Sequence, residues 1–309
     1  MGRLWALVKE TYRQWSNDNA SRLAAALAYY AAVSIAPLLV LLIALVGLVF
    51  GEDAARRELI SQVTNFMGED GAEFIKLVVE NADEPAVGGI ASLLSLAVLL
   101  WGSTNVFTQL QDSLNVIWNV RVNPANGIIT TIRKRVLSFG MVVVIGFLLL
   151  ISLVLSTVLA SLASSFGNSL PGPSMLWAVV NWLISFLMTT FLFAMVYKFL
   201  PDVHVAWRDV WIGATVTALL FTVGKSLLGI YLGNQGSSYG IAGSVVVFLL
   251  WVYYSAQILF FGAEFTQVYA TRYGGGFELG ENAELIQPPG GPVDRPQATP
   301  QPAGSGLRQ

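Results

Sequence analysis

Residues 23–51 read LAAALAYYAAVSIAPLLVLLIALVGLVFG, an uncharged stretch of 29 residues between Arg22 and Glu52. A single α-helix needs about 20 mostly apolar residues to cross the hydrocarbon layer of a membrane, because that layer is about 30 Å thick and each helical residue rises about 1.5 Å. The stretch therefore predicts a transmembrane helix and places the chain among the integral membrane proteins.

Further stretches with no charged residue or only one, Lys225 or Glu264, predict five more transmembrane helices. The second helix lies between Glu84 and Asp112, the fifth from Val210 onward, and the sixth from Ile241 to about Ala270. The 62 residues between Arg135 and Lys198 hold the third and fourth helices, which are separated at Pro171-Gly172-Pro173. The composition agrees, since 55% of the 309 residues are apolar and only 12% are charged, about half the share in soluble domains. We expect an all-α polytopic membrane protein with six transmembrane helices.

The distribution of Lys and Arg predicts which side of the membrane each connection faces. The N-terminal segment and the second and fourth connections carry these residues, whereas the third and fifth carry none. Because basic connections stay in the cytoplasm, both termini are expected to be cytoplasmic. The predicted organisation is a cytoplasmic segment (1–22), a six-span domain (23–273) with an extracytoplasmic amphipathic segment (52–84), and a disordered Pro/Gly-rich cytoplasmic tail (274–309).

The composition excludes several classes of function. The net charge of −2 argues against a strongly basic nucleic-acid binder, and the single His, His204, argues against a histidine-based metal site or catalytic triad. No nucleotide-binding G-x-x-x-x-G-K-[ST] segment occurs, so transport would be passive or driven by an ion gradient. We expect no enzymatic activity, no cofactor, no metal and no nucleic-acid partner. Membrane lipids are the expected partners, and a second copy of the chain or an envelope protein stays open.

Lys225 interrupts the fifth predicted helix, about 22 Å from its cytoplasmic end. A charge near the middle of a bilayer costs about 2.5–3.5 kcal/mol. Two interpretations stay open: the lysine snorkels to the outer surface, or it binds an anionic group in a polar interior, with Asn181 at a similar depth. Asn105 and Gln109 make the second helix too polar for lipid, so we expect that helix to face the interior.

Other residues near the membrane each have a functional and an ordinary interpretation. Arg22, Asp112 and Glu264 fall at the cytoplasmic side, where Arg22 either pairs with one of the two acids or serves as an exposed interfacial anchor. Pro37 removes one hydrogen bond from the first helix. It is either a hinge that moves during transport or a tolerated kink in a helix that packs through its alanines.

Several ordered motifs resemble one known family. They are residues 23–30 with Ser34 and Pro37, residues 112–118, Leu200-Pro201, Trp207-Arg208-Asp209, Gly213-Ala214, Gly224-Lys225, Tyr239-Gly240, Trp251 and Gly262-Ala263-Glu264. Over residues 10–273 the chain resembles the YihY/BrkB family of bacterial inner-membrane proteins. The resemblance implies a six-span protein of the bacterial cytoplasmic membrane, which the hydropathy and the charges predict independently.

The resemblance also implies an older ribonuclease BN label and an association with virulence. We expect no ribonuclease activity, because metal-dependent RNA hydrolysis uses clustered His, Asp and Glu ligands and RNA binding uses a basic surface. The expected function is that of a transporter, permease or lipid-flippase-like protein. The alternative is a non-transporting envelope or virulence-associated membrane protein that acts through a partner docked on residues 52–84.

Overall fold

The computed structural model describes residues 2–80, 90–122, 136, 139–151, 154, 173–232, 240–280 and 283–286. Its helices are α1 (Gly2–Asn17), α2 (Ala20–Phe50), α3 (Glu52–Glu80), α4 (Ile90–Ile117), α6 (Pro173–Phe199), α7 (Trp207–Leu232) and α8 (Gly240–Arg272), together with the apolar helix Phe139–Ile151. Within the part of the chain that the structure describes, four helical stretches are long and apolar enough to cross a membrane: Ala20–Phe50, Trp182–Phe199, Trp207–Leu228 and Gly243–Arg272. The predicted class, a mostly helical membrane protein, is confirmed.

The second and third predicted transmembrane helices are described only in part. α4 covers most of the second, whereas residues 81–89 before it, and residues 123–135 and 155–172 on either side of the third, lie outside the described residues. Six crossings and the cytoplasmic location of the termini therefore stay predictions.

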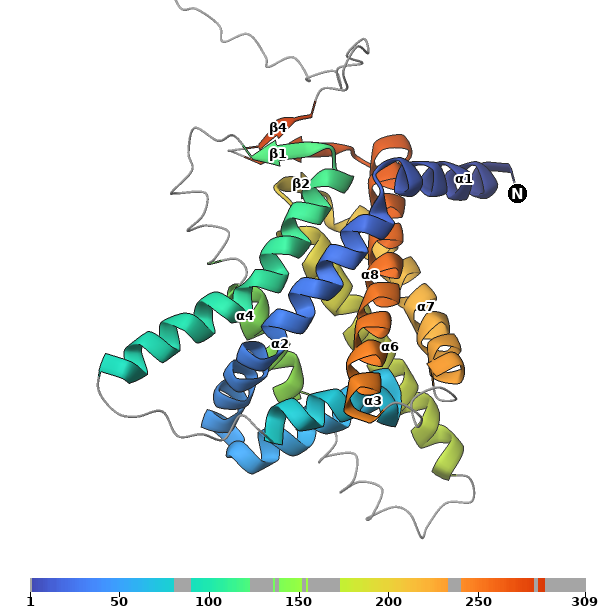
Figure 1. Cartoon of the computed structure of the whole chain (residues 1–309). Coiled ribbons are helices and arrows are strands. Elements are labelled where there is room, and N and C mark those ends of the chain that lie inside the picture. The colour runs from blue at the N-terminus through green and yellow to red at the C-terminus, as the bar shows by residue number, and fades with distance from the viewer. Residues whose placement is uncertain are drawn as a thin grey trace, which may run out of the picture.

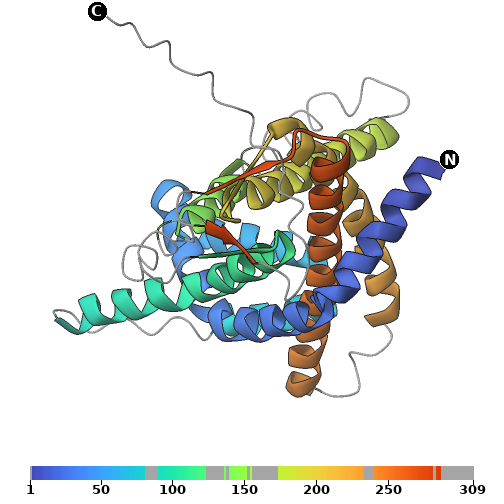
Figure 2. The ribbon, with the colours of Figure 1, turned by 90° about the horizontal axis from the view of Figure 1, so that it is seen from above.

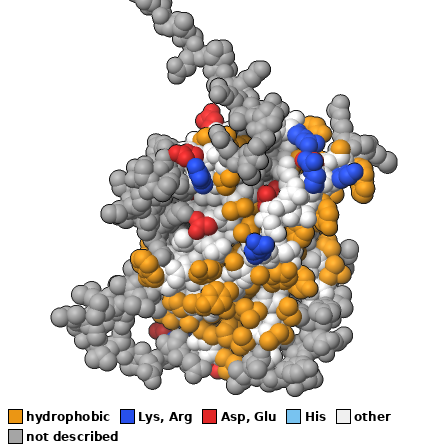
Figure 3. Space-filling model, turned by 45° about the horizontal axis from the view of Figure 1, so that its top comes forward, with side chains coloured by type: hydrophobic (Ala, Val, Ile, Leu, Met, Phe, Trp, Pro, Cys, Tyr) orange, Lys and Arg blue, Asp and Glu red, His pale blue; other side chains and the backbone are white. Residues whose placement is uncertain are grey.

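The long helices run between two ends of the molecule (Figure 1). α1 and four short strands lie at one end, which we name the terminal end, and α3 lies across the other end. Seen from above, α1 extends across the terminal end, where it packs against α8 (Figure 2). On the face shown in Figure 3, charged side chains gather toward the terminal end and hydrophobic side chains cover the region below them. That distribution is typical of a protein whose lower region faces lipid.

A reciprocal glycine–threonine crossing joins α7 to α8. A Cβ atom on Gly213 would collide with Thr266 Oγ1, and one on Gly262 would collide with Thr217 Oγ1. Each threonine donates to the carbonyl of the glycine on its own helix, from Thr217 to Gly213 at 2.8 Å and from Thr266 to Gly262 at 2.7 Å. Small residues at such positions let two helix backbones approach closely in a membrane.

α2 continues as a helix through Pro37 and packs closely against α4. A Cβ atom on Gly102 would lie 3.0 Å from Pro37 Cγ, so the glycine leaves room for the proline ring. Ala20, Ala24 and Ala28 are buried on the same helix. The contact agrees with the packing interpretation of Pro37, while its movement as a hinge stays a prediction.

α3 closes the end of the bundle opposite the termini. It consists of two helical parts that meet at Gly68, whose φ of 79° lies in the left-handed region that favours glycine. Its buried residues include Leu59 and Ile75, and Phe74 contacts Phe248 of α8 with ring centroids 5.0 Å apart. The segment is helical over Glu52–Glu80, and the apolar side of α3 packs on protein, while its extracytoplasmic location stays a prediction.

The chain beyond α8 differs from the disordered tail predicted for residues 274–309. β1 (Val120–Val122) pairs antiparallel with β4 (Ala283–Leu285), and β2 (Val203–Val205) pairs antiparallel with β3 (Phe277–Leu279). Trp118, only 1% exposed, contacts Phe277 edge to face at 5.2 Å. The tail prediction is therefore wrong for its first part, because apolar residues at alternate positions extend past the glycines. Residues 287–309 lie outside the described residues.

Candidate functional site

Two carboxyl groups meet at the terminal end, where α1, α2 and α8 come together. The chain turns between α1 and α2 at Asn19, whose φ is 53°, and this turn places the Asp18 carboxyl within hydrogen-bonding contact of the Glu264 carboxyl in α8. Glu264 is fully buried, and neither of its carboxyl oxygens accepts a hydrogen bond from an N–H or hydroxyl group of the described residues. Asp18 is half-buried.

The contact requires a proton, because two carboxylates cannot remain in contact in a poorly hydrated place without strong repulsion. Burial raises the pKa of Asp18 above its ordinary value, although the contact with Glu264 acts in the opposite direction. We name Asp18 and Glu264 the carboxyl pair.

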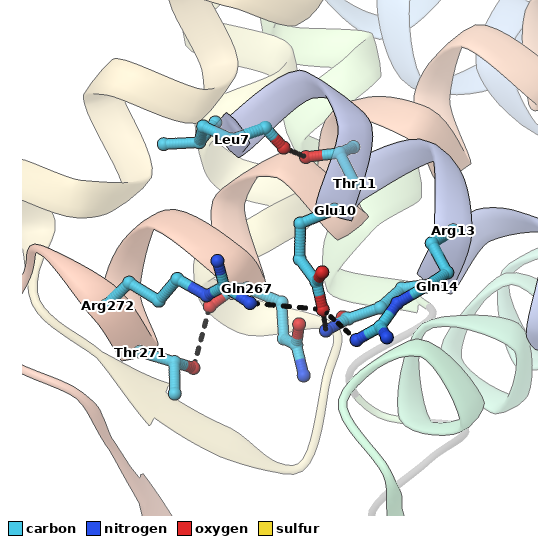
Figure 4. A network of polar contacts seen from close by, with 8 residues as sticks. All are labelled: Leu7, Glu10, Thr11, Arg13, Gln14, Gln267, Thr271 and Arg272. Atoms are coloured by element: carbon cyan, nitrogen blue, oxygen red, sulfur yellow. Dashed lines mark hydrogen bonds and ion pairs between the residues drawn. The ribbon is translucent and has the colours of Figure 1, made fainter. Parts of the chain in front are cut away.

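A polar network fastens α1 to the end of α8 (Figure 4). Glu10 of α1 forms ion pairs with Arg13 of the same helix and, at 3.2 Å, with Arg272 of α8, and it accepts a hydrogen bond from Gln14. Burial acts to raise the pKa of Glu10, but these three partners together lower it. The network keeps the α1–α2 turn over Glu264.

Several buried polar atoms on the same two helices have no hydrogen-bond partner among the described residues. Besides the Glu264 oxygens, they are Gln14 Oε1 and Trp15 Nε1 in α1, and Ser255 Oγ and Gln267 Oε1 in α8. Buried polar atoms without a partner are rare in folded proteins, and each needs a physical explanation. All of these atoms lie on α1 and α8, the two helices that meet at the carboxyl pair.

A second polar cluster lies at the same end, around Asp202 in the turn between α6 and β2. Asp202 Oδ2 accepts hydrogen bonds from Asn115 at 2.8 Å and Gln111 at 3.2 Å, while its backbone N–H donates to Asn115 Oδ1 at 2.8 Å. Its backbone carbonyl accepts the N–H of Gly280 at 3.0 Å. This cluster joins α4, the α6–β2 turn and the C-terminal strands, so its role is to hold these segments together.

The polar residues predicted for the membrane interior lie on different helices. Lys225 is half-buried on α7, and the preceding Gly224 makes room for Ile258 of α8. Asn105 and Gln109 are half-buried on α4, where Gln109 donates to Ser113 at 3.3 Å. The side chain of Asn181 lies outside the described residues.

The three residues predicted for ion pairs at the cytoplasmic side are also separated. Arg22 is exposed at the start of α2, and Asp112 is exposed on α4. Glu264 contacts Asp18, and no ion pair joins it to a basic residue of the described segments. Of these three, only Glu264 belongs to the carboxyl pair.

Asp18 and Asp202 are the site residues that the sequence reasoning missed. The run Asn17-Asp18-Asn19 directly before the first long apolar stretch signals a helix break. Nothing in the run names a partner 246 positions later in the chain. Asp202 follows Leu200-Pro201, and the sequence there indicates a turn but not the residues that Asp202 contacts.

Comparison with known proteins identifies relatives over most of the chain. The family model described as "Virulence factor BrkB" matches residues 11–286. A "UPF0761 membrane protein" of Tolumonas auensis is 30% identical over 263 residues, which cover 82% of each chain, and one of Psychromonas ingrahamii is 29% identical over 82% of this chain and 84% of its own. The ribonuclease-like protein YfkH of Bacillus subtilis is 22% identical, covering 84% of this chain and 93% of its own.

No solved structure matches the chain. The family match ends at Ile286, one residue after β4, so the C-terminal strands lie within the matched region. The chain is a membrane protein of the BrkB family.

Proposed function

We propose that the protein is a transporter, permease or lipid-flippase-like protein of the bacterial cytoplasmic membrane. The observation that carries the proposal is the burial of Glu264 within α8, a helix long and apolar enough to cross a membrane, without a basic partner among the described residues. An ionisable group in such a place is costly, and proteins retain one there chiefly to move ions or polar substrates.

The position of Lys225 favours a substrate that carries an anionic group. It is half-buried in α7, within the apolar stretch Trp207–Leu228. Several polar residues of α4 point into the protein: Ser103, Thr104, Gln111, Ser113 and Asn115 are all buried. A lipid-facing helix would not carry such a set.

The test reconstitutes the purified full-length protein in vesicles that contain a fluorescent phosphatidylglycerol analogue, and compares Lys225→Met with the wild type. The probe's movement between leaflets is measured by its loss of fluorescence after an impermeant quencher is added outside. Efflux of a trapped anionic dye is measured in parallel. We expect the wild type to accelerate one of the two processes and Lys225→Met to reduce that rate at least tenfold.

Lys9→Met is the matched control, because Lys9 is exposed on α1 at the terminal end. Its vesicles should behave as the wild type does. Wild-type vesicles that match protein-free vesicles in both measurements would overturn the proposed transport of anionic lipids and solutes.

The alternative function, docking of an envelope partner, has its own support in the exposed acids of α3. Glu73 and Glu80 are exposed on that helix, whereas its apolar side is buried in the bundle. Deleting α3 would expose the bundle and destroy the fold, so charge reversal by Glu73→Lys with Glu80→Lys is the better test. Loss of a cellular phenotype with unchanged vesicle activity would favour docking.

The printed name of one relative refers to a ribonuclease, and we do not extend that activity to this chain. Within the described residues, no group of three or more His, Cys, Asp or Glu side chains is placed to hold a metal ion. RNA incubated with the purified protein is expected to be cleaved no faster than RNA incubated with a heat-denatured sample.

A further inference from the structure

We propose that Asp18 and Glu264 bind one exchangeable proton between them, and that this carboxyl pair is the site at which the transporter couples to a proton gradient. The coupling part rests on the proposed function, whereas proton binding by the pair rests on the full burial of Glu264, on its carboxyl oxygens without a partner among the described residues, and on the Asp18 carboxyl beside it. The ligand is the proton itself, taken from water and returned to it.

The other described charged groups near the carboxyl pair either bind to other residues or are exposed to solvent. Glu10 and Arg13 of α1 pair with one another and, through Glu10, with Arg272 of α8. Asp209 at the start of α7 accepts the backbone N–H of Gly275 at 3.1 Å, and Arg22 at the start of α2 is exposed.

Asp112 of α4 and Lys9 of α1 are exposed as well. Asp18 is the charged neighbour that acts on Glu264. Because no cation of the described segments neutralises the pair, a shared proton is what permits the contact.

A proton from water can reach the carboxyl pair. Asp18 is half-buried in the α1–α2 turn, whereas Glu264 is fully buried in α8. A proton can therefore enter from water at the terminal end through Asp18 and reach Glu264 by one transfer between the two carboxyls. Three buried atoms on the same two helices, Gln14 Oε1, Trp15 Nε1 and Gln267 Oε1, have no hydrogen-bond partner among the described residues.

Release of the proton from the carboxyl pair changes the position of the α1–α2 turn. One O–H bond breaks, the proton passes to water, and the pair changes from one negative charge to two. The two carboxylates then repel each other, which drives the α1–α2 turn away from α8. Proton binding and the position of the turn are thereby linked, as coupled transport requires.

The experiment has two arms, and both use the full-length protein in lipid. In the first, infrared difference spectra are recorded while the pH is stepped, with Glu264→Gln as the variant and Glu58→Gln as the control. Glu58 is a buried carboxyl of α3 that accepts an ordinary hydrogen bond from Gln62 at 2.8 Å. The amide introduced by Glu264→Gln can still donate to Asp18, so the variant is expected to fold, and its unfolding temperature is measured to verify this.

We expect the wild type and Glu58→Gln to show the carbonyl stretch of a protonated carboxyl at pH 7, and Glu264→Gln to lose it. Asp18→Asn should shift the pH at which the band titrates, because the new amide donates to the Glu264 carboxylate. An identical band in wild type and Glu264→Gln overturns proton binding at this pair, whatever the vesicles show.

The second arm measures acidification of the lumen of proteoliposomes by a trapped pH-sensitive dye, after an inward proton gradient is imposed. We expect the wild type and Glu58→Gln to conduct protons and Glu264→Gln to fall at least tenfold. Loss of the infrared band together with unchanged proton flux in Glu264→Gln overturns the coupling role while proton binding stands. Absence of flux in the wild type, with the band present, refutes proton-driven transport and leaves the pair as a proton site.

Discussion

Gly262→Ala is predicted to destabilise the bundle, because Gly262 lies where three helices meet. A Cβ atom at this position would collide with Thr217 Oγ1 of α7 and would lie 2.6 Å from the hydroxyl oxygen of Tyr197 in α6. That hydroxyl donates to the Leu259 carbonyl at 2.8 Å and lies 3.0 Å from Thr217 Oγ1. The added methyl group therefore has to move a helix or break this hydrogen bond.

The change in the free energy of unfolding is the balance of two destabilising contributions and one stabilising contribution. Adding a methyl group to a closely packed core costs about 1–3 kcal/mol, and losing a buried hydrogen bond adds about 0.5–1.5 kcal/mol. The higher helix propensity of alanine returns about 1 kcal/mol. We expect a net loss of about 1–3 kcal/mol, which corresponds to a fall of roughly 2–10 °C in the unfolding temperature.

The assay is thermal unfolding of the full-length protein in detergent, followed by tryptophan fluorescence, with Gly140→Ala as the matched control. Gly140 is an exposed helical glycine with nothing within 4 Å of an added Cβ atom, so its substitution should leave the stability unchanged or raise it. The double variant Gly262→Ala with Thr217→Ala should be more stable than the sum of its two single losses. Equal stability of Gly262→Ala and Gly140→Ala, or strict additivity in the double variant, would refute the close crossing.

Three further outcomes are expected. Asp202→Ala should lower the free energy of unfolding by about 2–3 kcal/mol, measured by thermal unfolding, because it leaves the buried Asn115 amide without its charged acceptor. Truncation after Ile286 should leave the unfolding temperature unchanged, whereas truncation after Gly276 should lower it, because β3 and β4 are then lost. Glu10→Gln should lose less stability than the wild type as the pH falls below 4.5, because the lowered pKa of Glu10 contributes stability above that pH that protonation removes.

The sequence predicts the membrane class because hydropathy reports directly on whether a segment can leave water. It does not predict the crossing at Gly213 and Gly262, since a glycine in an apolar helix has the same local signal whether it faces lipid or a partner helix. The α7–α8 geometry depends on which residues meet across space, and a single sequence holds no information on that pairing. Lys225 illustrates the same limit, because its cost was evident from the sequence and its surroundings were not.

The tail shows why composition misleads at a boundary. The three glycines at 274–276 and the six prolines that follow dominate the average composition of residues 274–309. Gly274, however, makes room for the Asp209 carboxylate, and Gly276 adopts a φ of 75°, so these glycines turn the chain rather than end the fold. The strands that follow are three residues each, which is too short for an alternation of apolar residues to exceed chance.

The two electrostatic contacts of α1 oppose each other in their response to pH. Burial raises the pKa of Asp18 from its ordinary value of 3.8, so the stability that this group contributes is present at low pH and is lost as the pH rises through its folded-state pKa. The Glu10–Arg272 pair has the reverse sign: the stability that Glu10 contributes is fully present above pH 4.5 and is lost as the pH falls through its lowered folded-state pKa. Two like charges about 4 Å apart at an effective dielectric constant of about 20 repel by about 4 kcal/mol. A partly exposed ion pair contributes only about 0–1 kcal/mol. The carboxyl pair therefore outweighs the ion pair, and the position of the α1–α2 turn follows the proton on Asp18 and Glu264.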